Sequence, residues 1–277
     1  MSKYALLGYP LGHTMSPPIH KRLFELDGKP YSEYEVCEIP PEKLAERSEY
    51  LNSLNGYNIT IPYKVDIIKY LDGLDESAKR YNSVNCVVNR DGKNIGYNTD
   101  CSGFLRSLEA GGSKLGGRVL QIGCGGVGRM MAIEAALHGA ELTIVALPEF
   151  IAGAKEVAEE AAKLNPEAKI SVITHEEIHG EFDLLMNASP VGMYPNTDNC
   201  PVPEDVVLNC KCVFEVIYNP NVTKLMSIAE KNGIPAIGGM AMLVWQAAVA
   251  HEIWNGTTCR DEDVEKIIAE MKAELTK

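Results

Sequence analysis

The chain has 277 residues, of which 45% are hydrophobic and 23% are charged, and its formal net charge is −12. This balance is typical of a globular protein, and the length suits two modest domains or one large one. The negative charge argues against a nucleic-acid or anionic-membrane partner, because both would be repelled. It does not argue against a small acidic substrate, since a few local cations can bind one.

The lack of a recognisable targeting signal and the irregular cysteine spacing bear on the cellular compartment of the protein. The first residues lack the apolar core of a secretory signal, and no stretch reaches the roughly 18 apolar residues that span a bilayer. The eight cysteines are irregularly spaced, and Cys210 and Cys212 form only a C-x-C pair. We therefore expect a cytoplasmic protein with reduced thiols and no membrane partner.

The first hundred residues predict an α/β domain. Residues 3–10 form a short apolar strand, and Ser16 before Pro17 indicates the N-cap and first position of a helix that Gly28 ends. Residues 83–100 are typical of a hairpin whose turn is Asp91-Gly92. The elements between them alternate, with strands expected over 31–39 and 57–62 and helices over 41–56 and 64–82.

The pattern changes after a helix and a glycine-rich link over residues 101–117. Regular alternation follows, with strands expected over 118–123, 141–146, 169–174, 183–189 and 213–218 and helices over 126–139, 151–166 and 223–233. Such alternation predicts a doubly wound parallel sheet with helices on both faces. The helical segment from about Gly239 onward is expected to pack back on the first domain.

A glycine-rich turn links the first strand and first helix of this second region. Gly123, Gly125 and Gly128 form G-x-G-x-x-G, and Gly126 and Val127 complete the helix start. The glycines allow a tight turn and a close approach of a pyrophosphate, and the helix N-terminus offers free N–H groups to phosphates. The context predicts a dinucleotide site; the alternative is a turn without a ligand.

A second pattern, H-E-x-x-H, is formed by His175, Glu176 and His179. On a helix, the two histidines would be zinc ligands and the glutamate a general base. However, the segment lies between two expected strands, and Gly180 follows it directly. We therefore expect a polar surface connector and no metal site.

Polar residues gather at strand ends of the first domain, in "NITIPYK" (58–64), "SVNCV" (83–87) and "GYNTD" (96–100). Polar side chains in such surroundings need partners or a ligand. The chain here resembles the shikimate/quinate dehydrogenase family, and further motifs occur in the family's order. They are "GHTMSPPIH" (12–20), "GCGGVG" (123–128), "NASPVGM" (187–193), "VIYNPNVT" (216–223) and "MLVWQA" (242–247).

The resemblance implies a fold, an activity and site residues. A substrate domain would comprise residues 1–101 and 239–277, and a Rossmann-like nucleotide domain residues 102–238. The activity would be the interconversion of shikimate and 3-dehydroshikimate, in the route to chorismate and the aromatic amino acids. Lys64 and Asp100 match the family's catalytic lysine and aspartate. The substrate would contact Thr14, Ser16, Thr60, Asn85, Tyr218 and Gln246, and the cofactor would contact Val216, Gly239 and Met242.

The chemistry agrees with these roles, because hydride transfer requires a proton to move on or off the reacting oxygen. An amine beside a carboxylate can move that proton and stabilise developing negative charge without a metal. Two structural alternatives remain open at this point. Ser16 could be only an N-cap, and Lys64 and Asp100 could form an ordinary surface ion pair.

The residues after the second strand of the nucleotide domain bear on the choice between NAD and NADP. Members that use NADP commonly carry "NRT" there, where this chain has Ala146, Leu147 and Pro148. Glu149 follows, at about the distance from Gly128 expected of an acid that binds a ribose. Because arginine is the natural partner of a phosphate dianion, we expect NAD to be favoured, with NADP as the alternative.

The sequence leaves alternatives for the substrate and for the role of the protein. Ser83 and Cys86 depart from the family's pattern around Asn85, and Glu215 replaces its usual aspartate. Quinate or aminoshikimate is the alternative substrate, and a catalytically weak ligand-binding paralogue is the alternative role. As partners we expect a small-molecule substrate and either a monomer or a homodimer.

Overall fold

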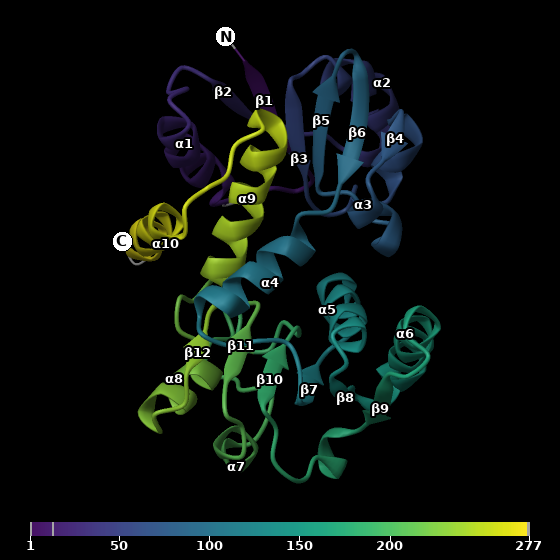
Figure 1. Cartoon of the computed structure of the whole chain (residues 1–277), viewed down its shortest axis with the longest axis vertical. Helices are drawn as coiled ribbons and strands as arrows, with labels where there is room; N and C mark the ends of the chain where they lie inside the picture. The colour runs from purple at the N-terminus through teal and green to yellow at the C-terminus, as the bar shows by residue number, and fades with distance from the viewer. Residues whose placement is uncertain (1, 13, 276–277) are drawn as a thin grey trace. The chain divides into compact units, whose positions relative to one another are not determined.

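The computed structural model describes residues 2–12 and 14–275, so His13 of the "GHTMSPPIH" motif lies outside the described part. The described chain forms two compact units (Figure 1). Unit 1 contains residues up to 103 together with residues 244–271, and unit 2 contains residues 104–243 and the chain from 272 onward. The division falls inside helices α4 (Asp100–Ala110), α9 (Gly239–Asn255) and α10 (Asp261–Leu275).

Unit 1 is built on a mixed six-stranded sheet in the order β2-β1-β3-β5-β6-β4. Strand β1 pairs in parallel with β2 and β3, whereas β5 pairs antiparallel with β3 and β6. The strands are β1 (Lys3–Gly8), β2 (Glu33–Glu38), β3 (Gly56–Ile59), β4 (Gly73–Leu74), β5 (Cys86–Arg90) and β6 (Lys93–Tyr97). The expected hairpin is confirmed, and its turn residues Asp91 and Gly92 have φ values of 53° and 77°.

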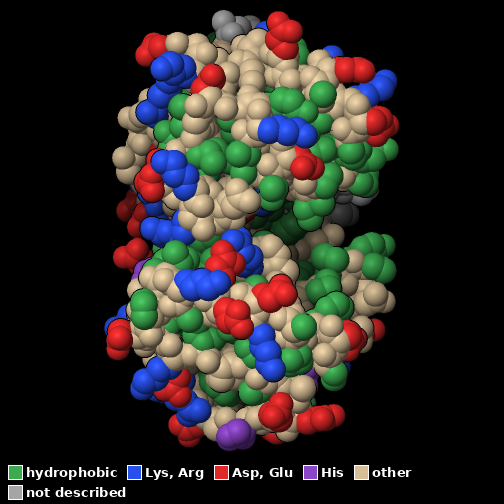
Figure 2. Space-filling view, turned by 90° about the vertical axis from the view of Figure 1, so that its right-hand side faces the viewer, with side chains coloured by type: hydrophobic (Ala, Val, Ile, Leu, Met, Phe, Trp, Pro, Cys, Tyr) green, Lys and Arg blue, Asp and Glu red, His purple; other side chains and the backbone are tan. Residues whose placement is uncertain are grey.

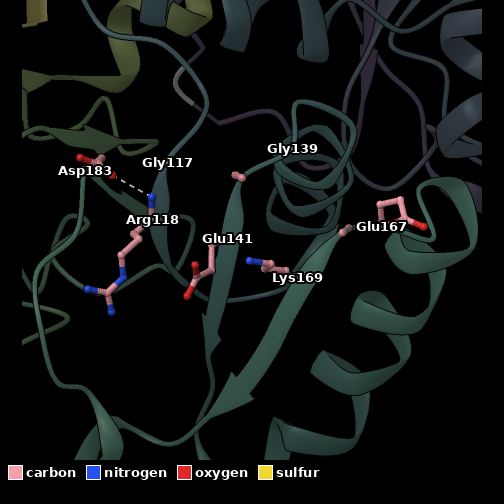
Figure 3. A pocket seen from close by; sticks show the side chains of 9 residues that line it. Gly117, Arg118, Gly139, Glu141, Glu167, Lys169 and Asp183 are labelled. Carbon is pink, nitrogen blue, oxygen red and sulfur yellow. Dashed lines mark hydrogen bonds between the residues drawn. The ribbon is translucent and has the colours of Figure 1, made fainter.

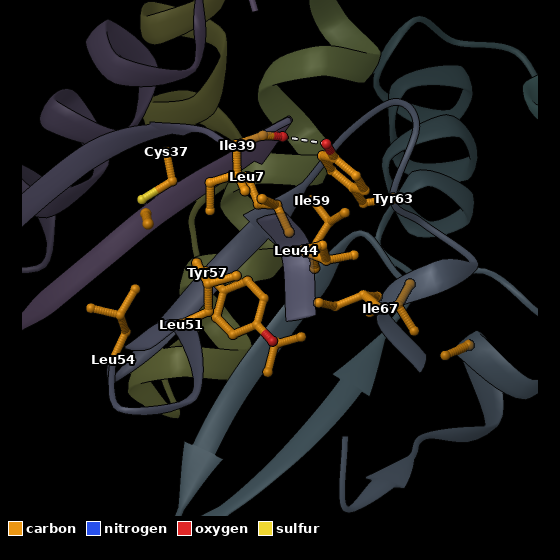
Figure 4. Packing of buried hydrophobic residues seen from close by; sticks show 14 residues of the cluster. Leu7, Cys37, Ile39, Leu44, Leu51, Leu54, Tyr57, Ile59, Tyr63 and Ile67 are labelled. Carbon is orange, nitrogen blue, oxygen red and sulfur yellow. Dashed lines mark hydrogen bonds between the residues drawn. The ribbon is translucent and has the colours of Figure 1, made fainter. Parts of the chain in front are cut away.

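One hydrophobic cluster of unit 1 packs helix α2 (Leu44–Asn52), which follows a 3₁₀ turn at Pro41–Lys43, against the sheet (Figure 4). Leu51 and Tyr57 are fully buried there, and the Tyr63 hydroxyl donates to the Ile39 carbonyl. Truncating a buried leucine such as Leu51 to alanine would cost about 2–5 kcal/mol. This packing holds β3 in place, and β3 leads directly into the "NITIPYK" motif.

Two helix predictions in unit 1 need correction. Helix α1 spans Ser16–Leu26, with Met15 at the N-cap, and no side chain caps it. Ser16 is therefore inside the first turn, and its hydroxyl is not used as a cap. The single helix expected over 64–82 is instead a 3₁₀ segment (Asp66–Tyr70), strand β4 and helix α3 (Glu76–Tyr81). It is broken because Asp75 caps α3 by accepting from the Ser77 N–H at 2.9 Å.

Unit 2 confirms the doubly wound prediction. Its six strands, in the order β12-β11-β10-β7-β8-β9, pair in parallel throughout. They are β7 (Arg118–Ile122), β8 (Glu141–Val145), β9 (Lys169–Ile173), β10 (Leu184–Asn187), β11 (Val213–Glu215) and β12 (Ala236–Ile237). The two-residue strand β12 was not expected, because so short a pairing leaves no periodic pattern.

Helices cover the strands of unit 2 in two groups. Helices α5 (Gly126–Leu137) and α6 (Ile151–Leu164) pack against each other and against β7, β8 and β9. Helix α8 (Lys224–Lys231) packs on β11, β12 and the short helix α7 (Glu204–Leu208). The residues that follow β7, β8, β10 and β11 thus meet at the carboxyl edge of a parallel sheet, where such folds bind ligands.

Acidic and basic side chains are interspersed on the face shown in Figure 2. None of the described helices combines the length and the apolar character that crossing a bilayer requires.

Candidate active site

The expected catalytic pair is assembled in unit 1. Lys64 lies just after β3, beyond a turn in which the Tyr63 N–H donates to the Thr60 carbonyl at 3.0 Å. Asp100 is the first residue of α4, and its N–H donates to the Asn98 side chain at 3.1 Å. The Lys64 Nζ and Asp100 Oδ2 atoms are 2.5 Å apart, and their side chains are 26% and 12% exposed. The pair is therefore largely sheltered, unlike an ordinary surface ion pair.

Asn85 connects this pair to helix α9. Its Nδ2 donates to Asp100 Oδ1 and to Gln246 Oε1, both at 2.9 Å, and its Oδ1 accepts from the Thr99 N–H at 2.7 Å. Asn85 is buried, and these contacts hold its amide in one orientation. Because the Gln246 oxygen is occupied by Asn85, its NH₂ group is the part that remains to donate to a substrate oxygen.

The expected carboxylate-binding hydroxyls lie at the start of α1. The Thr14 hydroxyl accepts from the Ser16 N–H at 3.2 Å, which fixes the turn that presents both side chains. Both residues are partly exposed, as is Thr60 after β3. Tyr34, which the sequence did not single out, donates from its hydroxyl to Asn58 Oδ1 at 3.0 Å. Only the pairing of β2 with β1 and of β1 with β3 brings Tyr34 to Asn58.

The glycine turn of unit 2 fits the pyrophosphate of a dinucleotide. Gly123 has a φ of 89°, and a Cβ at Gly128 would lie 2.5 Å from the Gly123 carbonyl oxygen. A Cβ at Gly125 or Gly126 would meet nothing within 4 Å, so the protein leaves room there. The first helical bond runs from the Arg129 N–H to Gly125, so the amides of Gly126, Val127 and Gly128 precede the helical ladder.

Gln121 supports this turn and could not have been identified from its pattern. It is fully buried at the end of β7, and its Nε2 donates to the carbonyls of Gly123 and Gly128 at 3.0 and 2.8 Å. The side chain thus joins the two ends of the glycine motif. A lone glutamine in an apolar strand carries no sequence signal for such a role.

The other expected cofactor residues lie near the ends of β11 and α9 in unit 2. A Cβ at Gly239 would lie 2.0 Å from the Val216 carbonyl oxygen, so only glycine allows this approach. Met242, one turn later in α9, is buried. Tyr218 is half-buried, and burial raises the pKa of its hydroxyl.

Glu215 fixes the segment that carries Val216 and Tyr218. It is fully buried, and its carboxylate accepts from Asn187 Nδ2, from the Thr223 hydroxyl and from the Ile217 N–H at 3.0–3.1 Å. Burial raises the pKa of this carboxyl to about 7, and these hydrogen bonds act in the opposite direction. Glu215, which replaces the family's usual aspartate, thus has hydrogen-bond donors to both of its carboxylate oxygens.

The end of β8 offers no cation. Ala146 is buried, Leu147 is half exposed, and a 3₁₀ turn at Pro148–Phe150 places Glu149 on the surface. Because Pro148 ends the extended backbone, Glu149 lies in a helical turn and not on the strand. This segment therefore contains neither the arginine of an NADP site nor an acid at the strand end.

The H-E-x-x-H pattern is not helical over its length. A 3₁₀ turn covers only His175–Glu177, and Thr174 and Glu177 form a capping box around it. His179 lies beyond the turn and is exposed. Within residues 2–12 and 14–275, no three histidine, cysteine or acidic side chains are grouped as metal ligands.

A pocket of about 290 Å³ lies elsewhere in unit 2 (Figure 3). It is lined by the first residues of β7, β8 and β9, which are Arg118, Glu141 and Lys169. The glycine turn follows the last residue of β7, so this pocket lies at the opposite edge of the sheet. It contains none of the expected site residues.

Comparison with known proteins agrees with this geometry. Residues 6–87 match the family model of the shikimate dehydrogenase substrate binding domain. A protein from Caldanaerobacter subterraneus named "Shikimate dehydrogenase (NADP(+))" is 36% identical, over 97% of both chains. The Thermus thermophilus shikimate 5-dehydrogenase, solved with NADP(H) and shikimate, is 30% identical with a TM-score of 0.85, over 98% of this chain and 100% of that one. The Listeria monocytogenes enzyme, solved with shikimate and NAD, is 29% identical with a TM-score of 0.86, over 97% and 96% of the two chains.

These relatives correct one prediction and establish the family. The expected preference for NAD is wrong, because curated relatives along the whole chain are named for NADP(+). A missing arginine is a weak argument, since backbone N–H groups, hydroxyls and lysines also bind phosphate. The identity and coverage of these relatives, together with the matched substrate-domain model, place the chain in the shikimate dehydrogenase family.

Proposed function

We propose that this chain interconverts shikimate and 3-dehydroshikimate with NADP as cofactor. The observation that carries the proposal is the sheltered Lys64–Asp100 pair, at 2.5 Å, held by Asn85 beside Gln246. The names of the relatives support the choice of substrate and cofactor. We assign substrate binding to unit 1 and dinucleotide binding to unit 2.

Lys64 is proposed to move the proton. In the oxidation direction, its neutral amine accepts the proton of the reacting hydroxyl, and in the reduction direction its ammonium returns one. Asp100 holds Lys64 Nζ in place and balances the positive charge that appears on it. Asp100 is itself held by Asn85 and by the start of α4, whose N-terminal dipole favours a carboxylate.

The remaining polar groups of unit 1 are proposed to bind and orient the substrate. Ser16 and Thr14 would hold its carboxylate, and Thr60, Asn85 and Gln246 would contact its ring hydroxyls. The Gln246 amide can donate to an oxygen because Asn85 occupies its own oxygen.

The residues of unit 2 are proposed to hold NADP. Amides of Gly126, Val127 and Gly128 would bind its pyrophosphate, with Gly123 and Gly125 shaping the turn. Val216, Gly239 and Met242 would lie at its nicotinamide end, with Tyr218 on the substrate side. When bound, the dinucleotide supplies the hydride donor or acceptor.

A steady-state matrix of shikimate and quinate against NADP and NAD tests this proposal. We expect the highest kcat/KM for shikimate with NADP. A higher kcat/KM with quinate would refute the substrate assignment, and absence of turnover with every pair would refute the activity.

A further inference from the structure

A buried polar chain in unit 1 is not used by the proposed reaction. His251 of α9 contacts Asp27 at the end of α1, with Nδ1 and Oδ2 2.6 Å apart. The other ring nitrogen of His251, Nε2, lies 3.0 Å from His20 Nδ1. The two rings are 0% and 2% exposed, so the chain Asp27–His251–His20 lies in the interior.

The hydrogen bonds among Asp27, His251 and His20 determine which ring nitrogen of each histidine carries a proton. Ionised Asp27 only accepts, so His251 donates to it from Nδ1, as Asn255 Nδ2 also does at 2.6 Å. A neutral imidazole has one donor, so His251 Nε2 accepts and His20 donates from Nδ1. Burial lowers the pKa of both histidines, which keeps both rings neutral. Each ring therefore has one tautomer and one orientation.

The hydrogen-bonded series Asp27–His251–His20 ends next to residues that are proposed to bind the substrate. The His20 ring stacks on the Tyr34 ring, with centroids 4.1 Å apart and planes inclined by 14°. The Tyr34 hydroxyl donates to Asn58 at 3.0 Å, and the Ser16 side chain lies close enough to lower the pKa of that hydroxyl against the larger, opposite effect of burial. Asn58 in turn donates to the Asn85 carbonyl at 3.3 Å. A fixed His20 ring thus fixes the tyrosine that lies beside Ser16.

Hydrophobic packing alone does not require a histidine at position 251. The His251 ring lies among Phe24 and Trp254, with centroids 4.4 and 5.3 Å away. A phenylalanine would fill the same aromatic cluster without the cost of burying polar nitrogens. What the hydrogen bonds add is direction, because they prevent the His20 ring from turning under Tyr34.

We propose that Asp27, His251 and His20 position Tyr34 and Ser16 for substrate binding, with His251 as the central positioning residue. This inference rests on the proposed function, in which Ser16 holds the substrate carboxylate. None of the three residues is among those to which the proposed function assigns contact with the reacting atoms or the cofactor. Their loss should therefore weaken substrate binding while leaving proton transfer at Lys64 intact.

His251→Phe tests the proposal, because it keeps the ring and removes both hydrogen bonds. We expect the KM for shikimate to rise about tenfold, while kcat changes less than threefold and the KM for NADP is unchanged. Asp27→Asn keeps an acceptor but removes the charge, so a rise of about threefold is expected. If His251→Phe does not fold, the KM of Asp27→Asn for shikimate tests the positioning role by itself.

Trp254→Phe is the matched control. Trp254 belongs to the same aromatic cluster and donates to the Val87 carbonyl at 2.9 Å, but it is not part of the chain. It should lower the Tm and leave the KM for shikimate unchanged. An active wild type whose KM is unaltered by both His251→Phe and Asp27→Asn overturns the positioning role alone. A wild type that does not turn over shikimate overturns the proposed function as well.

Discussion

Replacement of Lys64 by alanine separates a catalytic ion pair from a structural one. Positioned acid–base groups contribute about 10²–10⁴-fold to rate, so kcat should fall by that factor, or about 3–5 kcal/mol of transition-state stabilisation. Stability should change little, because Asp100 keeps its hydrogen bonds with Asn85 and Asn98. A cost of about 1 kcal/mol is expected for the lost pair, or a Tm shift of about 2–4 °C.

The assay is initial rates of shikimate oxidation at saturating NADP, with thermal unfolding measured on the same samples. Lys64→Arg keeps the charge, but arginine does not release a proton, so kcat should stay low. Lys79→Ala is the matched control, because Lys79 forms a 2.6 Å ion pair with Glu76 in which both side chains are more than half exposed. It should leave kcat unchanged. If Lys64→Ala keeps more than a tenth of wild-type kcat, the assigned role of the pair is refuted.

Three further predictions follow from the two units. Leu147→Arg should lower the KM for NADP relative to NAD by about 10–150-fold, because a guanidinium adds a charge-assisted hydrogen bond of about 1.5–3 kcal/mol. An unchanged ratio would contradict a 2′-phosphate beside β8. Gly125→Ala should raise the KM for NADP with the Tm unchanged, whereas Gly128→Ala should lower the Tm, since its Cβ would lie 2.5 Å from the Gly123 oxygen; equal Tm values would count against this. The free energy of unfolding should fall as pH drops below about 6.5, because burial lowers the pKa of both His20 and His251 and the unfolded chain binds those two protons more readily; Glu215, whose pKa is raised to about 7, acts in the opposite direction with one proton. Urea titrations from pH 7.5 to 5.5 check this, and His251→Phe should make the fall less steep, because it removes one of the two histidine contributions.

Local patterns determined much of the fold. The period of apolar residues and the glycine turns correctly predicted the parallel sheet of unit 2 and the hairpin at Asp91-Gly92, because both signals depend on neighbouring residues. The same reasoning missed the break in the segment 64–82 and the exact start of α1. Capping by Asp75, and the lack of capping by Ser16, depend on side-chain directions that spacing does not contain.

The sequence by itself also determined the family, because its motifs occur in one order over nearly the whole chain. Tertiary structure decided how the candidate site is joined. Lys64 meets Asp100 across 36 positions, Asn85 meets Gln246 across 161, and His20 meets His251 across 231. The physical reason is that these hydrogen bonds depend on strand order and helix packing. Neither strand order nor helix packing can be inferred from the residues adjacent in the sequence.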